Sequence, residues 1–202
     1  MAKRFGLFLV ALALTSCGEL KTEEEEVDQD ATEYVKLNIQ GSDSAIDGQH
    51  ALTRVDECSL DADSGLLKTA FSASTKDQLE ISIKGFSTEA SSSYSCTQAP
   101  DNQSGDLGSK YNGCGVKLIL ENASGNTDSY SSYRDSSDVK DFTYASDCTI
   151  NVTYADNALS GSVSCANLVQ THLDGAPRNP IDTSVVATLA SGSTFQCQVS
   201  SK

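Results

Sequence analysis

The fold is decided by the stretch from Cys148 to Cys165, which reads CTINVTYADNALSGSVSC. Apolar and polar residues alternate on both sides of Asp156-Asn157, a period of two that is typical of half-buried strands. Asp and Asn tolerate the positive φ angles that a two-residue hairpin turn requires. The stretch therefore predicts an antiparallel β-hairpin with its turn at Asp156-Asn157.

The position of this turn sets the register of the hairpin. The expected pairs are Ala155 with Ala158, Tyr154 with Leu159, Val152 with Gly161, Ile150 with Val163, and Cys148 with Cys165. The last pair does not exchange backbone hydrogen bonds, so its Cα atoms should lie about 4.5 Å apart. A disulfide can bridge that distance. The apolar face and the cysteines select the same register, which predicts a Cys148–Cys165 bridge.

The same alternation recurs outside the hairpin and extends the fold to residues 34–202. It is found in Val35-Leu37-Ile39, Leu79-Ile81-Ile83 and Val116-Leu118-Leu120. Turn-forming Gly, Asn, Asp and Ser separate these short strands. The pattern predicts one all-β domain, an antiparallel β-sandwich or flattened barrel stapled by disulfides, with room for a short helical turn within residues 87–106.

The N-terminus carries an export signal. Lys3 and Arg4 precede a short apolar run that ends at Leu14, and about 20 apolar residues would be needed for a membrane-spanning helix. Residues Leu14-Thr15-Ser16-Cys17 then resemble the lipobox of bacterial lipoproteins. The resemblance implies a signal peptide over residues 1–16, a diacylglyceryl group on the Cys17 thiol, and a further acyl chain such as palmitate. A conventional signal cleaved after Ala13, with Cys17 left as a free thiol, is the alternative.

Such a lipoprotein would be anchored in the cell envelope. We expect the outer membrane, with the domain on its periplasmic or surface-exposed face. Residues 17–33 would form an extended, self-repelling tether, since Lys21 is the one basic residue there. The acidic residues of this segment are Glu19, Glu23, Glu24, Glu25, Glu26, Asp28, Asp30 and Glu33. It also resembles the surface-export signals of some lipoproteins, the alternative being a plain spacer. The formal net charge of −14 argues against nucleic acid or anionic lipid as a partner.

The number of cysteines also favours a location in the cell envelope. The chain has seven cysteines, an odd number for a secreted protein. If Cys17 carries lipid, six remain for three bridges in an oxidising compartment. Cys96–Cys114 would close a Gly-, Asn- and Ser-rich loop, which leaves Cys58–Cys197 as the third bridge. A connectivity in which these four cysteines are exchanged stays open.

The C-terminal segment Leu159–Val199 resembles the last strands of mycobacterial lipoprotein antigens. Those proteins also end in a hairpin and a cysteine-bearing strand on a small β domain. The resemblance implies an architecture and no activity.

The sequence contains no recognisable catalytic or metal-binding motif. The two histidines, His50 and His172, have no metal-ligand spacing, and no phosphate-binding or Cys-x-x-Cys motif occurs. Asp63-Ser64-Gly65 is typical of a turn rather than of a serine nucleophile. Acidic turns around Asp47, Asp61 and Asp101 lack the terminal Glu of an EF-hand calcium loop. We therefore expect no catalytic residue, no metal and no cofactor.

Four tyrosines suggest a binding surface. Tyr94, Tyr111, Tyr130 and Tyr133 stand in Ser-, Asn- and Gly-rich segments, a composition typical of adaptable binding loops. The alternative is that each tyrosine pins its loop to the sheet.

The expected function is that of a monomeric, non-catalytic envelope or surface lipoprotein that binds a protein or a glycan. A structural or assembly accessory of an envelope complex is the alternative. A small hydrolase is a third reading, which would require His50 or His172 in a pocket beside a carboxylate or hydroxyl.

Overall fold

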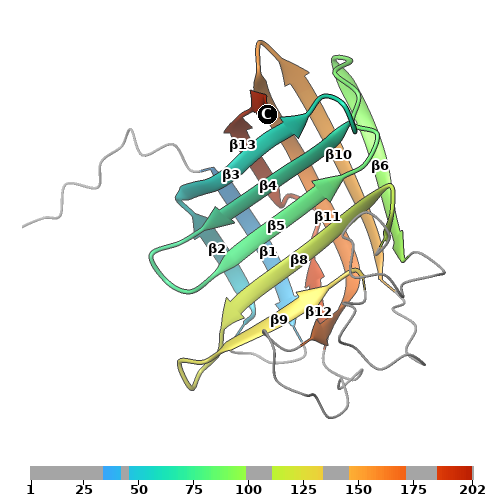
Figure 1. Ribbon diagram of the computed structural model, residues 1–202. Helices are drawn as coiled ribbons and strands as arrows, with labels where there is room; N and C mark the ends of the chain where they lie inside the picture. The colour runs from blue at the N-terminus through green and yellow to red at the C-terminus, as the bar shows by residue number, and fades with distance from the viewer. Residues whose placement is uncertain (1–33, 42–45, 99–110, 134–145, 172–185, 202) are drawn as a thin grey trace, which may run out of the picture. The chain divides into compact units, whose positions relative to one another are not determined.

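Figure 1 shows the computed structural model, which describes residues 34–41, 46–98, 111–133, 146–171 and 186–201. The expected signal peptide, Cys17, the expected tether and His172 lie outside these residues. Within them every regular element is a β-strand, so the predicted all-β fold is confirmed. The described residues contain no helix capable of traversing a membrane.

The described residues form fourteen strands. Their bounds are β1 (Val35–Gly41), β2 (Gly48–Leu52), β3 (Arg54–Asp61), β4 (Leu66–Ser72), β5 (Gln78–Ile83), β6 (Ser91–Gln98), β7 (Tyr111–Asn112), β8 (Cys114–Glu121), β9 (Thr127–Ser131), β10 (Asp147–Ala155), β11 (Ala158–Thr171), β12 (Val186–Leu189), β13 (Thr194–Gln198) and β14 (Ser200–Ser201).

The strands form one continuous sheet that folds into two layers. The front layer runs β3-β4-β5-β8-β9, and these strands cross over β1, β11 and β13 of the rear layer (Figure 1). The long strand β11 connects the layers, because it pairs with β9 as well as with β10, β12 and β13. All pairings are antiparallel except that of β14 with β3.

The core lies between the two layers and is built from the alternating apolar residues. Leu79, Ile81 and Ile83 of β5 face it from the front, and Leu159 and Val163 of β11 face it from the rear. These residues are almost completely buried. The period of two in the sequence therefore has its predicted cause, a sheet with one face buried.

Gly161 leaves space in this core for the ring of Phe195. It lies opposite Phe195 of β13, whose ring contacts Phe71 of the front layer with 6.2 Å between the centroids. A Cβ atom on Gly161 would stand 2.7 Å from the Cζ atom of Phe195 and 2.5 Å from the backbone oxygen of Asn151. Only glycine leaves room for the ring here.

The hairpin of β10 and β11 has the predicted register at every expected pair. Asp156 and Asn157 form the turn with φ angles of 52° and 61°. The Cα atoms of Cys148 and Cys165 are 4.0 Å apart, and the two residues are bridged. The register and the bridge are both confirmed.

The other two disulfides join the layers. Cys58 of β3 is bonded to Cys197 of β13, and Cys96 of β6 is bonded to Cys114 of β8. The exchanged connectivity is therefore not adopted. Cys148 lies between two cysteines, since the register also places Cys96 opposite it on the side away from Cys165.

Candidate functional site

A groove of about 800 Å³ crosses the solvent-facing side of the rear layer. Its walls and floor come from β6, β10, β11 and β13, together with Tyr34 just before β1. Strand alternation explains its composition. Where inward positions carry Val152 and Phe195, the outward positions between them carry small polar side chains.

The register aligns these outward side chains in rows across the strands. One row runs through Ser93, Asn151, Ser162 and Thr194. Neighbouring strands lie about 4.8 Å apart, so each row presents a polar group at that interval. The row therefore spans four strands at nearly constant spacing.

A second row runs parallel to the first, two residues further along each strand. It consists of Ser91, Thr153, Ser160 and Gln196. Together the rows cover the groove with hydroxyl and amide groups, which can both donate and accept hydrogen bonds.

The groove carries no formal charge. None of the described residues that line it is Asp, Glu, Lys, Arg or His. Within the described part of the chain, the side chains of Asn151, Ser160, Ser162 and Thr194 make no hydrogen bond to other protein groups. Their hydrogen-bonding capacity is thus directed at the solvent or at a ligand.

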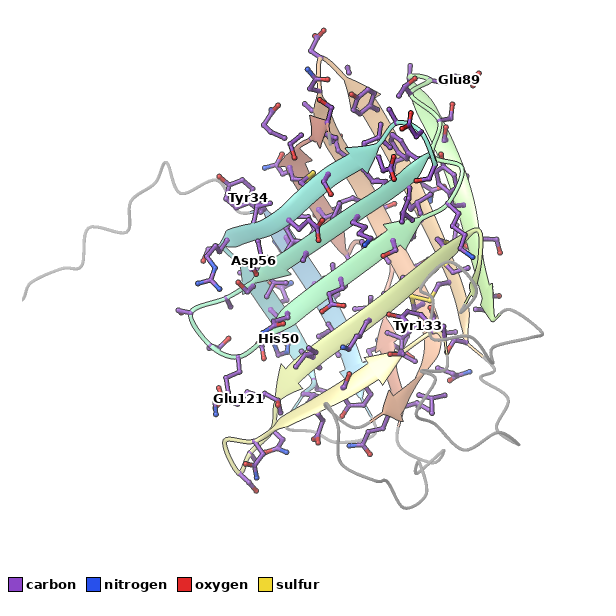
Figure 2. The ribbon with its side chains drawn as sticks, in the orientation of Figure 1. Tyr34, His50, Asp56, Glu89, Glu121 and Tyr133 are labelled. Atoms are coloured by element: carbon purple, nitrogen blue, oxygen red, sulfur yellow. A yellow bond between two sulfur atoms is a disulfide. The ribbon has the colours of Figure 1, made fainter. Side chains whose placement is uncertain are left out.

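Tyr34, labelled in Figure 2, is half-buried and lines the groove together with Thr194, Phe195 and Gln196 of β13. Its carbonyl oxygen accepts a hydrogen bond of 2.7 Å from the backbone N–H of Gln196, which ties it to the end of the second row. Among the described lining residues it is the one aromatic side chain that is not fully buried. No pattern in the sequence distinguishes Tyr34 as a site residue.

The four tyrosines named from the sequence do not form an exposed cluster. Tyr130 lies in β9 opposite Leu118 and is 1% exposed, and Tyr133 is 9% exposed. Tyr94 lies in β6, where its hydroxyl accepts a 2.8 Å hydrogen bond from the Ser87 N–H and its ring stacks on Phe86. Tyr111 is in β7, and its side chain is outside the described residues.

The loop-binding interpretation therefore needs correction for Tyr94, Tyr130 and Tyr133. Serine-rich flanks suggested loops, but Tyr94 and Tyr130 lie within β6 and β9, whereas Tyr133 follows β9 and is buried. Ser131 and Ser132 are themselves buried beside Tyr130, and Ser132 Oγ accepts a 2.9 Å hydrogen bond from the Val116 N–H. A small hydroxyl that finds a partner can be buried at little cost, so serine alone does not mark a loop.

His50 is one of the two histidines considered for a hydrolase site from the sequence. Its Nδ1 atom lies 2.9 Å from Oδ2 of Asp77, and its Nε2 atom lies 3.1 Å from the backbone oxygen of Ile46 (Figure 2). Oδ1 of Asp77 accepts a 2.9 Å hydrogen bond from the Glu121 N–H. The cluster thus connects β2 of the rear layer with the β4–β5 turn and the end of β8.

His50 and Asp77 each stabilise the charged form of the other. The hydrogen bond to Asp77 raises the pKa of His50, although burial opposes the change. Burial acts to raise the pKa of Asp77, but the hydrogen bonds from His50 and the Glu121 N–H outweigh it and the pKa is lowered. Both imidazole nitrogens face acceptors, so an imidazolium that donates twice satisfies the geometry. The contacts of His50 are those of a structural tie, with neither nitrogen presented to a substrate.

The Asp63-Ser64-Gly65 triplet forms the β3–β4 turn, as predicted. The carboxylate of Asp61 accepts hydrogen bonds from the backbone N–H groups of Asp63 and Ser64, at 3.0 and 3.3 Å. Hydrogen bonding from Ser64 and Asp63 also lowers the pKa of Asp61. Among the described residues, no group of three or more His, Cys, Asp or Glu side chains is arranged to hold a metal ion.

No protein family, curated protein or solved structure matches this chain.

Proposed function

We propose that this chain is a lipid-anchored protein of the cell envelope that binds a ligand in the groove of the rear layer without transforming it. The observation that carries this proposal is the pair of polar rows. They place hydroxyl and amide groups at regular spacing on a rigid sheet, and those of Asn151, Ser160, Ser162 and Thr194 make no hydrogen bond within the described residues.

The disulfides support a location outside the cytoplasm. Three bridges consume Cys58, Cys96, Cys114, Cys148, Cys165 and Cys197, and structural disulfides persist in oxidising compartments. The seventh cysteine, Cys17, then has no other cysteine to pair with in its own chain. That remainder agrees with the lipobox resemblance, in which Cys17 carries the lipid.

The composition of the groove favours binding over catalysis. Acid–base and nucleophilic mechanisms need a titratable group poised near the reacting atoms. The described lining offers a tyrosine, hydroxyls and amides, and His50 lies outside it with both ring nitrogens engaged. Small polar groups on a fixed scaffold suit recognition, since little side-chain entropy is lost when they bind.

The anchor is tested by metabolic labelling with radioactive palmitate in bacteria that produce the full chain. Wild-type protein should be labelled and Cys17→Ala should not. The conservative variant Cys17→Ser should also lose the label, because an oxygen does not replace the sulfur in the thioether. Continued labelling of either variant would show that the lipid is elsewhere.

The binding site is tested with two matched tryptophan variants. Ser162→Trp places a large ring in the groove, whereas Ser82→Trp places the same ring on the outer face of β5 in the front layer. The mature chain without lipid, carrying Cys17→Ala, is cosedimented with cell envelopes isolated from bacteria that lack the protein, so that the anchor cannot cause retention. We expect the added Ser162→Trp change to abolish the retention that the Cys17→Ala parent and its Ser82→Trp derivative show; equal retention of all three would exclude the groove.

A further inference from the structure

We infer that the ligand of the groove is an uncharged glycan chain lying along β10 and β11, an inference that rests on the function proposed above. The register of these strands forms three successive outward pairs, which are Thr153 with Ser160, Asn151 with Ser162, and Thr149 with Ser164. The pairs form a ladder of polar side chains along the hairpin.

The ladder is longer than the groove itself. The first two pairs line the groove, and the third lines a second hollow of about 280 Å³ on the same two strands. That hollow also contains Thr188 from the strand segment beside β11. Successive outward pairs are about 6.6 Å apart, so the two hollows together accommodate several units of a linear polymer.

The charges of the chain and of the groove lining favour an uncharged polymer as the ligand. The chain has a formal net charge of −14, which disfavours anionic glycans and nucleic acid as ligands. Among the described residues the groove lining carries no charged side chain, whereas Asp147 lines the far end of the second hollow and Lys36 pairs with Thr194 at the β1 edge of the groove. The three ladder pairs between them offer an ionic ligand no counter-charge. A neutral polyol needs none, because its many hydroxyls pair with groups that both donate and accept.

Tyr34 supplies the apolar contact that such a ligand needs. Sugar rings carry C–H groups on their faces, and an aromatic ring with a polar tip binds them while remaining partly wet. Tyr34 is half-buried beside Gln196, so its ring is held in place before any ligand arrives. A preordered aromatic side chain loses little entropy on binding.

The underlying core keeps the ladder rigid. Ile150, Val152 and Val163 lie on the reverse side of the same strands and are buried, and the Cys148–Cys165 bridge joins the strands near the third pair. A binding surface on paired strands is better ordered than one on loops.

The test is isothermal titration of the full mature protein, held in a detergent without a sugar headgroup. The probes are the neutral hexaoses of the maltose, cellulose, mannan and chitin series. Two charged counterparts are added, the deacetylated chitosan hexamer and hexagalacturonate. We expect at least one neutral hexaose to bind, with an affinity that changes less than about twofold between 50 and 500 mM salt, since no ion pair is formed.

Point variants locate the bound chain. Ser162→Trp should abolish binding of the neutral hexaose, whereas Ser82→Trp should not change it. Asn151→Ala should weaken binding about fivefold to tenfold, the effect of one or two lost hydrogen bonds. Ser164→Trp should lower the affinity for the hexaose and leave the affinity for the corresponding trisaccharide unchanged.

Tyr34 is tested by a conservative pair. Tyr34→Phe should keep the affinity, and Tyr34→Ala should lower it about tenfold, because only the second change removes the ring. Circular dichroism and non-reducing peptide maps of every variant verify that the sheet and the three bridges are intact.

The inference is overturned if no neutral hexaose binds, if only charged oligomers bind, or if the two tryptophan variants behave alike. Its failure differs from that of the proposed function. If envelopes retain the protein through the groove but no neutral hexaose binds, only the ligand class is wrong. If envelopes retain nothing in a groove-dependent way, the proposed function fails as well.

Discussion

The two outer faces of this domain are both built from antiparallel strands, but their outward side chains differ. On the front layer the outward residues include Lys68, Glu80 and Lys117, with Glu80 and Lys117 on neighbouring strands. On the rear layer the equivalent positions carry Ser, Thr and Asn around the groove. Mixed charges are an ordinary way to keep a sheet face soluble. A groove whose described lining has hydroxyl and amide groups but no charge needs another explanation, and ligand binding is the one proposed here.

The largest expected effect comes from removing the bridge that holds the two faces back to back. Cys58 and Cys197 are 139 residues apart, so their bridge closes a long loop, whereas Cys96 and Cys114 are 18 residues apart. In the chain-entropy model the long loop contributes about 5 kcal/mol and the short one about 3 kcal/mol. Urea unfolding of the two double Cys→Ala variants should rank them in this order. The reverse order would mean that native packing, and not loop length, governs their stability.

A smaller effect is expected directly beneath the groove. Gly161→Ala pushes a Cβ atom against the Phe195 ring and the Asn151 carbonyl, so the free energy of unfolding should fall by about 1–3 kcal/mol. Ser160→Ala is the matched control, because Ser160 faces outward and its Cβ is already present. The control should unfold within about 0.5 kcal/mol of wild type. If Gly161→Ala is equally stable, the rear strands are free to shift and the groove is not preordered.

The His50–Asp77 tie predicts how the connection between the layers responds to pH. The pKa of His50 is raised from its ordinary value of 6.5, so its stabilisation is complete below that value and is lost as the pH rises through the raised pKa. The pKa of Asp77 is lowered from 3.8, so its stabilisation is present above that value and is lost as the pH falls through the lowered pKa. Stability from this pair should therefore be greatest between about pH 4 and 6.5.

His50→Gln and Asp77→Asn provide the measurement. Urea midpoints recorded from pH 3 to 9 should show a decline for wild type on the alkaline side that both variants lack. At pH 5.5 each variant should be about 1–2 kcal/mol less stable than wild type, somewhat below the range of about 1.5–3 kcal/mol for hydrogen bonds to charged groups because both side chains are partly exposed to solvent. A wild-type decline that persists in both variants would assign it to another group.

The smallest effect is expected from the charged front face. Glu80→Gln and Lys117→Gln should each change stability by less than about 0.5 kcal/mol, since exposed cross-strand charges contribute little. Neither should change ligand affinity, whereas Ser162→Glu in the groove should remove it. A front-face variant that impaired binding would show that the two faces do not have separate roles.

The hairpin was predictable from sequence because its determinants are local. The alternation, the turn residues Asp156 and Asn157, and the cysteine spacing all select one register within a short stretch. The Cys58–Cys197 bridge was reached by elimination, and the pattern alone could not place β3 beside β13. Pairings distant in sequence are set by the whole core, which no short window contains.

The groove was not predictable for the same reason. Ser91 and Ser93 belong to β6, a strand within a segment where a helical turn had been allowed, and they become a binding surface only beside β10. Tyr34 was not distinguished from the other tyrosines. The one local signal was the alternation of serines around Gly161, which the hairpin register had already directed outward. Polar alternation opposite a buried face is therefore worth examining as a site in its own right.

The order of the cysteines along the chain has a consequence for biosynthesis. If the chain is exported as proposed, the sulfur of Cys58 leaves the export channel first among the six and must remain available until Cys197, the last, has followed. In the meantime it meets Cys96, Cys114, Cys148 and Cys165, all of which have native partners nearer to them in the chain. A catalyst that joined thiols in order of emergence would trap Cys58 with Cys96. Secretion of this domain therefore calls for an enzyme that reshuffles disulfides as well as one that forms them.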